Sequence, residues 1–169
     1  MPGRASTTTG AAWRHCLKLQ RRGSQFYVGA LSPAQKEALA LYLNFDMIGS
    51  PNAGFFVYDG DGSGGGVAGP SGSGEIERVL EDYYRRHGVQ PRSVDLKLST
   101  DHLSFVSAGI PVGGIFSGHD GIKSAEQAAL WGGTRGAAYD PCYHKVCDVL
   151  ANADNSAFRF NVQAVLAAS

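Results

Sequence analysis

Residues 41–48, LYLNFDMI, form a run that is almost wholly apolar around Asn44 and Asp46. A short apolar run of this kind is typical of a strand that is covered on both faces, as in the centre of an α/β sheet. The run stops at GSPN, residues 49–52, which is a turn-forming sequence. We therefore predict a buried strand over residues 41–48, with Asp46 near its carboxyl end.

Other segments repeat this strand pattern. GFFVYDG at residues 54–60, SVDLKLS at 93–99 and IPVGGIFSG at 110–118 are predicted to be strands because they alternate in polarity or are continuously apolar. Helical segments separate them, and strands that alternate with helices predict α/β layers around a mostly parallel or mixed sheet.

The helices are indicated by apolar spacing and by capping residues. Ser32 and Pro33 have the residue types favoured at the N-cap and first position of a helix. A second helix is predicted at residues 75–87, where apolar side chains recur at helical spacing: Ile76, Val79, Leu80, Tyr83 and Tyr84. A closing helix is expected to be capped near Asn155 or Ser156.

Composition limits the class of partner. The chain has 169 residues, 43% of them hydrophobic, which suffices for one globular domain with a buried core. Lys+Arg 15 and Asp+Glu 15 give a formal net charge of +0, so neither nucleic acid nor an anionic membrane is expected as a partner. No run approaches the roughly twenty apolar residues of a membrane span. A small molecule, a peptide or another protein is the expected partner.

Residues 1–23 differ from the rest of the chain. They carry five basic residues, and the first acidic residue of the chain is Glu37. The basic residues are Arg4, Arg14, Lys18, Arg21 and Arg22. The stretch has no clear apolar period and no apolar core of a secretory signal. We expect a basic leader here.

Residues 59–74 form a glycine- and serine-rich stretch that predicts a flexible surface loop. Asp59, Asp61 and Ser63 followed by Gly64 imitate the start of a calcium-binding loop. The twelfth position of such a loop needs a bidentate glutamate, and Pro70 stands there. We therefore favour a plain loop over a calcium site.

The chain lacks the common catalytic motifs. It contains no G-x-S-x-G, no G-x-x-x-x-G-K-[ST], no H-E-x-x-H and no C-x-x-C. Asp101 and His102 could form a dyad, but neighbouring side chains on a strand or helix point apart, so we expect them to be structural. We assign no role to His15, His119 or Cys16.

Two further features could carry chemistry. Asp46 is expected at the carboxyl end of a covered strand, where open α/β sheets bind ligands, although a loop-capping carboxylate is an alternative. In CYHKVC, His144 is either a zinc ligand or a buried histidine beside a small loop. Cys142 and Cys147 are close enough in sequence for a disulfide, which implies an oxidising compartment, or they could bind metal as thiolates.

Several motifs occur in order along the chain: YLNFDMIGSPN, FFVYD, TDH, GIPVGGIFSG, KSAEQAALWGGT and AYDPCYHKVCD. Together they closely resemble the secreted bacterial zinc aminopeptidases of the aminopeptidase S type, within clan MH of the co-catalytic dizinc exopeptidases. The resemblance extends from about Gly23 to the end of the chain. It implies a phosphorylase/hydrolase-like α/β fold with a mixed central sheet between helices.

The resemblance also implies a site with two zinc ions that share a bridging aspartate. Asp46 matches the aspartate that binds one zinc, and His144 matches the histidine that binds the other. Tyr143 matches the tyrosine whose hydroxyl stabilises the oxyanion that develops in the transition state. Met47 and Phe116 match the walls of the apolar pocket for the N-terminal side chain of the substrate.

A disulfide between Cys142 and Cys147 is implied as the frame of Tyr143 and His144. The implied reaction is removal of an N-terminal residue from a peptide, preferably a large apolar one such as leucine. A zinc-bound water attacks the first peptide carbonyl while a glutamate serves as general base. The family suggests a secreted monomer, although this chain carries no signal peptide.

The chain departs from the family before the segment that matches Ser24, where a histidine ligand, the bridging aspartate and two glutamates are expected. It keeps one ligand for each zinc, although such an ion takes three protein ligands, so the zinc site is expected to be incomplete. Ser99 stands where the aminopeptidase S type has an arginine near the substrate amine. Asn155 and Arg159 replace aspartates of its calcium site, and calcium is not expected.

We therefore expect residues 24–169 to be the C-terminal portion of a zinc aminopeptidase domain that lacks its N-terminal strands. Residues 1–23 are expected to be an aberrant leader that arises from a frameshift with partial deletion, or from a gene-model error. This polypeptide alone is expected to be inactive. The alternative is a non-catalytic remnant or peptide-binding module that uses the pocket near Met47 and Phe116 without metal.

Overall fold

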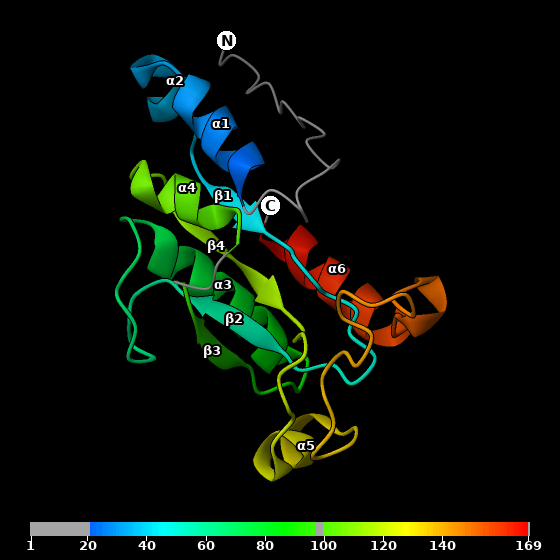
Figure 1. Ribbon diagram of the computed structural model, residues 1–169. Helices are drawn as coiled ribbons and strands as arrows, with labels where there is room; N and C mark the ends of the chain where they lie inside the picture. The colour runs from blue at the N-terminus through cyan, green and yellow to red at the C-terminus, as the bar shows by residue number, and fades with distance from the viewer. Residues whose placement is uncertain (1–20, 97–99, 169) are drawn as a thin grey trace.

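The computed structural model describes residues 21–96 and 100–168, and four strands in this part form one sheet (Figure 1). The strands are β1 (Tyr42–Asn44), β2 (Phe56–Asp59), β3 (Arg92–Asp95) and β4 (Val112–Phe116). Their order is β1-β4-β2-β3. β1 is parallel to β4 and β2 is parallel to β3, whereas β2 is antiparallel to β4. The predicted α/β class with a mixed central sheet is confirmed.

Helices lie on both sides of this sheet (Figure 1). α1 (Arg22–Ala30) and α4 (His102–Ser107) cover one face, and α3 (Ser73–Arg86) and α6 (Asn155–Ala167) cover the other. The remaining elements are α2 (Pro33–Glu37), α5 (Ala125–Trp131) and a short 3-10 turn η2 (Leu150–Asn152). Of the residues assigned to the leader, Arg22 and Gly23 belong to α1. His15, Cys16 and Ser99 lie outside the described residues.

Two hydrophobic cores fill the space between the helices and the two faces of the sheet. Neighbouring residues of β2 point into different cores, as side chains of a strand must. Tyr58 belongs to the core with α1 and α4, whose members are Val28, Tyr58, Leu96, Phe105, Ile110 and Val112. Val57 belongs to the core with α3 and α6, whose members are Val57, Ile76, Leu80, Tyr84, Ile115 and Ala164. The sheet is therefore the middle layer of three.

The predicted helix starts are confirmed to within a few residues. Ser32 caps α2, since its hydroxyl accepts a hydrogen bond from the Gln35 amide at 3.3 Å while the Gln35 side chain accepts one from the Ser32 amide. α3 begins at Ser73, two residues before the predicted start at residue 75. The cap of α6 is Asp154, not Asn155 or Ser156, because its carboxylate accepts hydrogen bonds from the Ser156 and Ala157 amides.

The strand predicted over residues 41–48 is shorter than expected. β1 ends at Asn44, whose side-chain amide donates to the Tyr58 hydroxyl at 3.3 Å. Three residues later Met47 has a φ of 54°, in the left-handed region that no strand contains. Asp46 therefore lies in the loop after the strand, not within it. The strand predicted over 93–99 also ends early, at Asp95.

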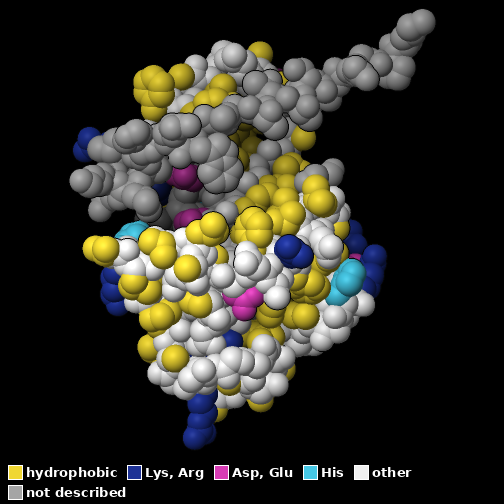
Figure 2. Space-filling model, turned by 90° about the vertical axis from the view of Figure 1, so that its right-hand side faces the viewer, with side chains coloured by type: hydrophobic (Ala, Val, Ile, Leu, Met, Phe, Trp, Pro, Cys, Tyr) yellow, Lys and Arg dark blue, Asp and Glu magenta, His cyan; other side chains and the backbone are white. Residues whose placement is uncertain are grey.

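The face that carries α6 and η2 is rich in hydrophobic side chains (Figure 2). The exposed large ones of these two elements and of the adjoining loop are Val146, Val149, Leu150, Phe158 and Leu166. In the part of the chain that the structure describes, no helix combines the length and apolarity needed to cross a membrane.

Leu80 offers a test of the core between α3 and the sheet. Its side chain is fully buried, so Leu80→Ala should lower the free energy of unfolding by about 2–5 kcal/mol through lost burial and a residual cavity. The matched control is Leu166→Ala in α6, because Leu166 is 70% exposed. The control should change stability by less than about 0.5 kcal/mol in the same urea titration. Equal losses in both variants would contradict this packing.

Candidate functional site

The carboxyl ends of β1 and β4 lie at the same edge of the sheet because the two strands are parallel. The loop after β1 carries Asp46, and the loop after β4 begins with Ser117. The two loops are joined directly, since the Ser117 amide donates to the Met47 carbonyl at 2.8 Å. The Ser50 amide also donates to the Ser117 hydroxyl at 3.0 Å. Open α/β sheets commonly bind ligands at such an edge.

Asp46 has a perturbed carboxyl group. Its side chain reaches solvent, but the atoms packed around the carboxylate partly desolvate it, and this is the main cause that raises the pKa of Asp46. The negative charge of Asp101 raises it further, whereas His144 and His119 lower it. A carboxylate in such surroundings gains from a positive partner.

The segment after residue 139 is closed by a disulfide between Cys142 and Cys147, whose Cα atoms are 5.2 Å apart. Of the possibilities that the sequence left open, the disulfide is therefore confirmed. The buried carboxylate of Asp140 holds the start of this loop, because it accepts hydrogen bonds from the Cys142 amide and the Asn152 side chain, each at 2.8 Å. The loop presents Tyr143 and His144.

Aromatic rings connect this loop to β4. The Tyr143 ring stacks on the His144 ring, with ring centroids 3.8 Å apart. It also stacks on the ring of His119, with ring centroids 5.3 Å apart. His119 in turn lies 5.4 Å from the ring of Phe116 at the end of β4. Partial burial, followed by the negative charges of Asp46 and Asp120, raises the pKa of Tyr143. The Tyr143 hydroxyl therefore stays protonated at neutral pH.

His119 is the residue that the sequence analysis missed. Its Nδ1 pairs with the carboxylate of the next residue, Asp120, and its ring lies between Phe116 and Tyr143. It also lowers the pKa of Asp46. The available signal was the position of His119 directly after a predicted buried strand, in SGHDG.

Lys123 and Tyr139 hold together the loops next to this site. The buried ammonium of Lys123 donates to the carbonyls of Ala53 and Gly132, at 2.8 and 2.9 Å, and burial lowers its pKa. Tyr139 packs against Gly118, where a β-carbon would lie 2.2 Å from the Tyr139 ring. Gly118 also has a φ of 98°, so glycine is required on both counts.

Asp101 and His102 do not form a catalytic dyad, as predicted. The His102 ring is fully buried and is bonded through one nitrogen to the Leu96 carbonyl and through the other to the Thr100 hydroxyl. Burial is the main cause that lowers the pKa of His102. Both ring nitrogens are thus used in holding the segment before α4.

The metal-binding capacity of the site is limited by its ligand count. Asp46 and His144 supply an oxygen and a nitrogen, both suitable for zinc. In residues 21–96 and 100–168, the one group of three His, Cys, Asp or Glu ligand atoms within 4.8 Å of one another lies elsewhere, at Asp59, Asp61 and Glu77. The described residues therefore do not complete a zinc centre around Asp46 and His144.

Comparisons with known proteins agree on one family. The sequence profile described as peptidase family M28 matches residues 20–169. The chain is 48% identical over 154 residues to an aminopeptidase of Pseudomonas aeruginosa, a match that covers 91% of this chain and 29% of that protein. It is 44% identical to leupeptin-inactivating enzyme 1 of Streptomyces exfoliatus, over 90% of this chain and 32% of that protein. The chain thus spans about a third of the length of these relatives.

Solved structures show the same fold. A zinc aminopeptidase from Bacillus subtilis superposes with a TM-score of 0.64 at 22% sequence identity, covering 89% of this chain and 32% of that chain. A glutaminyl cyclase from Bacteroides thetaiotaomicron superposes with a TM-score of 0.58 at 17% identity, covering 86% and 43%. At these identities the likeness concerns the fold alone.

Gly118 tests how the loops support the site. Gly118→Ala should destabilise the chain by about 2 kcal/mol or more, because the methyl group displaces Tyr139 and alanine is strained at a positive φ. Gly121→Ala is the control, since its β-carbon would meet Tyr139 at an ordinary 3.7 Å. Urea unfolding of both variants measures the difference, and similar stabilities would contradict the contact.

His102 tests the pH dependence of stability. Because its folded pKa is lowered from 6.5, the unfolded chain binds a proton more readily, so the contribution to stability is full above about pH 6.5 and is lost below it. In His102→Gln, the fall in melting temperature between about pH 7.5 and 5.5 should be smaller than in the wild type. An unchanged pH dependence in His102→Gln would contradict the assignment.

Proposed function

Because the chain belongs to peptidase family M28, we propose that it forms part of a zinc-dependent aminopeptidase that releases N-terminal residues from peptides. The observation that carries this proposal is the convergence of Asp46, Tyr143 and His144 at the edge where β1 and β4 end. The names of relatives, which include a leucine aminopeptidase 2 of Trichophyton rubrum, support a preference for large apolar residues such as leucine.

Asp46 and His144 are the proposed zinc ligands of this chain, one for each of two ions. A bound zinc would supply a Lewis acid and a water that is acidic enough to act as nucleophile near neutral pH. These residues fit zinc by donor type, but the described residues do not complete its ligand shell. What the chain itself offers is two donor side chains that are close enough for His144 to lower the pKa of Asp46.

Tyr143 is the proposed catalytic residue of this chain. Its raised pKa keeps the hydroxyl protonated, so it can donate a hydrogen bond to an oxygen that gains negative charge during attack on a peptide carbonyl. The stacked rings of His119 and His144 restrict the rotation of the tyrosine ring. Met47 and Phe116 are proposed to line the pocket for the apolar N-terminal side chain.

The disulfide indicates the kind of compartment in which the protein acts. Cys142 and Cys147 are bonded, and such bonds persist in oxidising compartments and are rare in the cytosol. We propose a secreted protein that acts as a monomer on peptides. Retention of this bond after purification in the presence of a thiol-blocking reagent would test the compartment.

Zinc binding tests the proposed ligands without relying on activity. Calorimetric titration of the metal-free chain with zinc should show binding. Asp46→Asn and His144→Ala should each weaken this binding by about tenfold or more. Asp82→Asn on α3 and His87→Ala at its end remove matching groups away from this edge of the sheet and should leave binding unchanged. Binding that is insensitive to both ligand variants would overturn the assignment. Leucine-peptide binding that persists in chelator would instead support a peptide-binding module.

Activity of this 169-residue polypeptide alone is expected to be unmeasurable. No acidic residue precedes Glu37, so the chain has no candidate there for the bridging aspartate or the glutamate base that the resemblance implies. Hydrolysis of a leucine anilide should not exceed that of the Tyr143→Phe variant. Turnover that survives repurification, is lost to chelator and falls in Tyr143→Phe, but not in Tyr27→Phe, would contradict this expectation.

A further inference from the structure

A surface groove lies between α1, α2 and α4, on the side of the sheet that faces away from α3 and α6. It encloses about 360 Å³, and beside it a hydrogen bond of 3.0 Å joins the hydroxyls of Ser24 on α1 and Ser104 on α4. The charged residues that line it are Arg21 and Lys36, and no acidic residue of the described part of the chain does so. We call this feature the basic groove. It contains none of the residues proposed for the peptidase site.

The basic groove follows two neighbouring helices. On one side it is lined by Arg21, Gln25 and Gly29, which are four residues apart and therefore share a face of α1. On the other side Leu103 and Ser107 have the same spacing on α4. A rise of 1.5 Å per residue gives the groove a length of about 12 Å along α1. Arg21 lies at the start of this face, and α2, which carries the second cation, follows the end of α1.

Arg21 contributes an unused donor to the groove. Its Nε is buried, and within residues 21–96 and 100–168 this atom has no hydrogen-bond partner. A buried donor without an acceptor is energetically costly. Burial is the main cause that lowers the pKa of His102, and the positive charge of Arg21 contributes in the same direction. The guanidinium therefore lies within electrostatic reach of the start of α4, and an anionic acceptor in the groove would satisfy its free donor.

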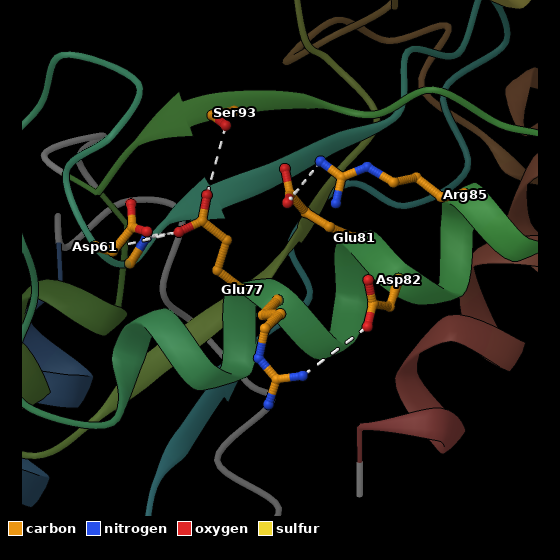
Figure 3. A network of polar contacts seen from close by, with 8 residues as sticks. Asp61, Glu77, Glu81, Asp82, Arg85 and Ser93 are labelled. Carbon is orange, nitrogen blue, oxygen red and sulfur yellow. Dashed lines mark hydrogen bonds and ion pairs between the residues drawn. The ribbon is translucent and has the colours of Figure 1, made fainter.

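The two positive charges of the basic groove are not neutralised by described carboxylates. Neither Arg21 nor Lys36 forms an ion pair with a described aspartate or glutamate. The arginines of α3 differ in this respect, as Figure 3 shows. Arg85 pairs with Glu81 at 2.9 Å, and Asp82 pairs with an arginine one turn before it and one turn after it. The basic groove thus offers two cations to a partner outside the described chain.

We propose that the basic groove binds an extended acidic peptide segment, with one carboxylate on Arg21 and a second on Lys36. An extended chain rises about 3.3 Å per residue, so two acidic residues about four positions apart match the length of the groove. A guanidinium can hold a carboxylate through two parallel N–H bonds, whereas an ammonium acts as a point charge. Between the two cations the groove is lined by Val28 and Leu103, which suit the uncharged residues of the segment.

Gly29 keeps the basic groove open. A β-carbon at this position would meet nothing within 4 Å, although Gly29 lies in α1, where glycine is less favourable than alanine. A side chain can therefore be introduced at residue 29 without displacing a neighbour. Glutamate at this position would place a competing negative charge inside the groove, and glutamine would add the same volume without the charge.

Peptide binding should be measured on the full chain by calorimetry, with a peptide that has blocked ends and two aspartates separated by three alanines. Chelator is present throughout, so the result does not depend on the proposed zinc ligands. Arg21→Gln and Lys36→Gln should each weaken binding by about fivefold or more, because each removes a charge that pairs with a carboxylate. Arg22→Gln is the matched control, since Arg22 is exposed, carries the same charge and does not line the groove. It should bind the peptide as the wild type does.

The variants at Gly29 separate charge from volume. Gly29→Glu should weaken peptide binding by about tenfold or more, whereas Gly29→Gln should weaken it by less than about threefold. Equal losses in the two variants, no binding by the wild type, or binding that persists in both Arg21→Gln and Lys36→Gln would overturn the proposal. Inorganic phosphate is the competitor to test. If it displaced the peptide at an equal concentration, the groove would be a site for a small anion and the assignment to an acidic peptide would be wrong.

Discussion

The close packing of β4 against its neighbours is the constraint on which the rest of the structure depends. β4 pairs with β1 on one side and β2 on the other. A β-carbon at Gly113 would lie 2.2 Å from the Ile76 side chain, so glycine allows α3 to lie directly on the strand. This approach sets the position of Glu77, one residue further along α3. β4 also ends with Phe116 at the edge where Asp46 lies, and His119 follows three residues later.

The sequence predicted those elements whose signals are local. The pattern of IPVGGIFSG at residues 110–118 predicted β4, and the spacing of Ile76, Leu80 and Tyr84 predicted α3. The end of β1 could not be located in this way, because apolar residues continue to Ile48. What ends the strand is the left-handed backbone at Met47, whose carbonyl accepts the Ser117 amide from a loop seventy residues away in sequence. Hydrophobic periodicity does not report such a bond.

The same distinction applies to the proposed site. The family resemblance located Asp46, Tyr143 and His144 because they lie in recognisable motifs, and the structure brings them within electrostatic reach of one another. His119 was missed because its role arises from stacking on Tyr143, which is far from it in sequence. The sequence also did not show that Glu77 on α3 accepts hydrogen bonds from the amides of Gly60 and Asp61, at the start of the glycine-rich loop. Contacts between distant segments, not composition, define these features.

Two of the three non-glycine residues with a positive φ in the described part of the chain belong to the proposed site, and the third, Arg21, precedes α1. Met47 and His144 have φ values of 54° and 57°; Met47 follows the proposed zinc ligand Asp46, and His144 is itself a proposed ligand. Non-glycine residues in this region cost of order 1 kcal/mol or more, and they persist where their surroundings hold them. At Met47 the holding contact is the bond to Ser117, and at His144 it is the disulfide and the stacked Tyr143 ring. The two strained positions are thus held by different contacts, and each of them fixes the backbone at or beside a residue that we propose as a zinc ligand.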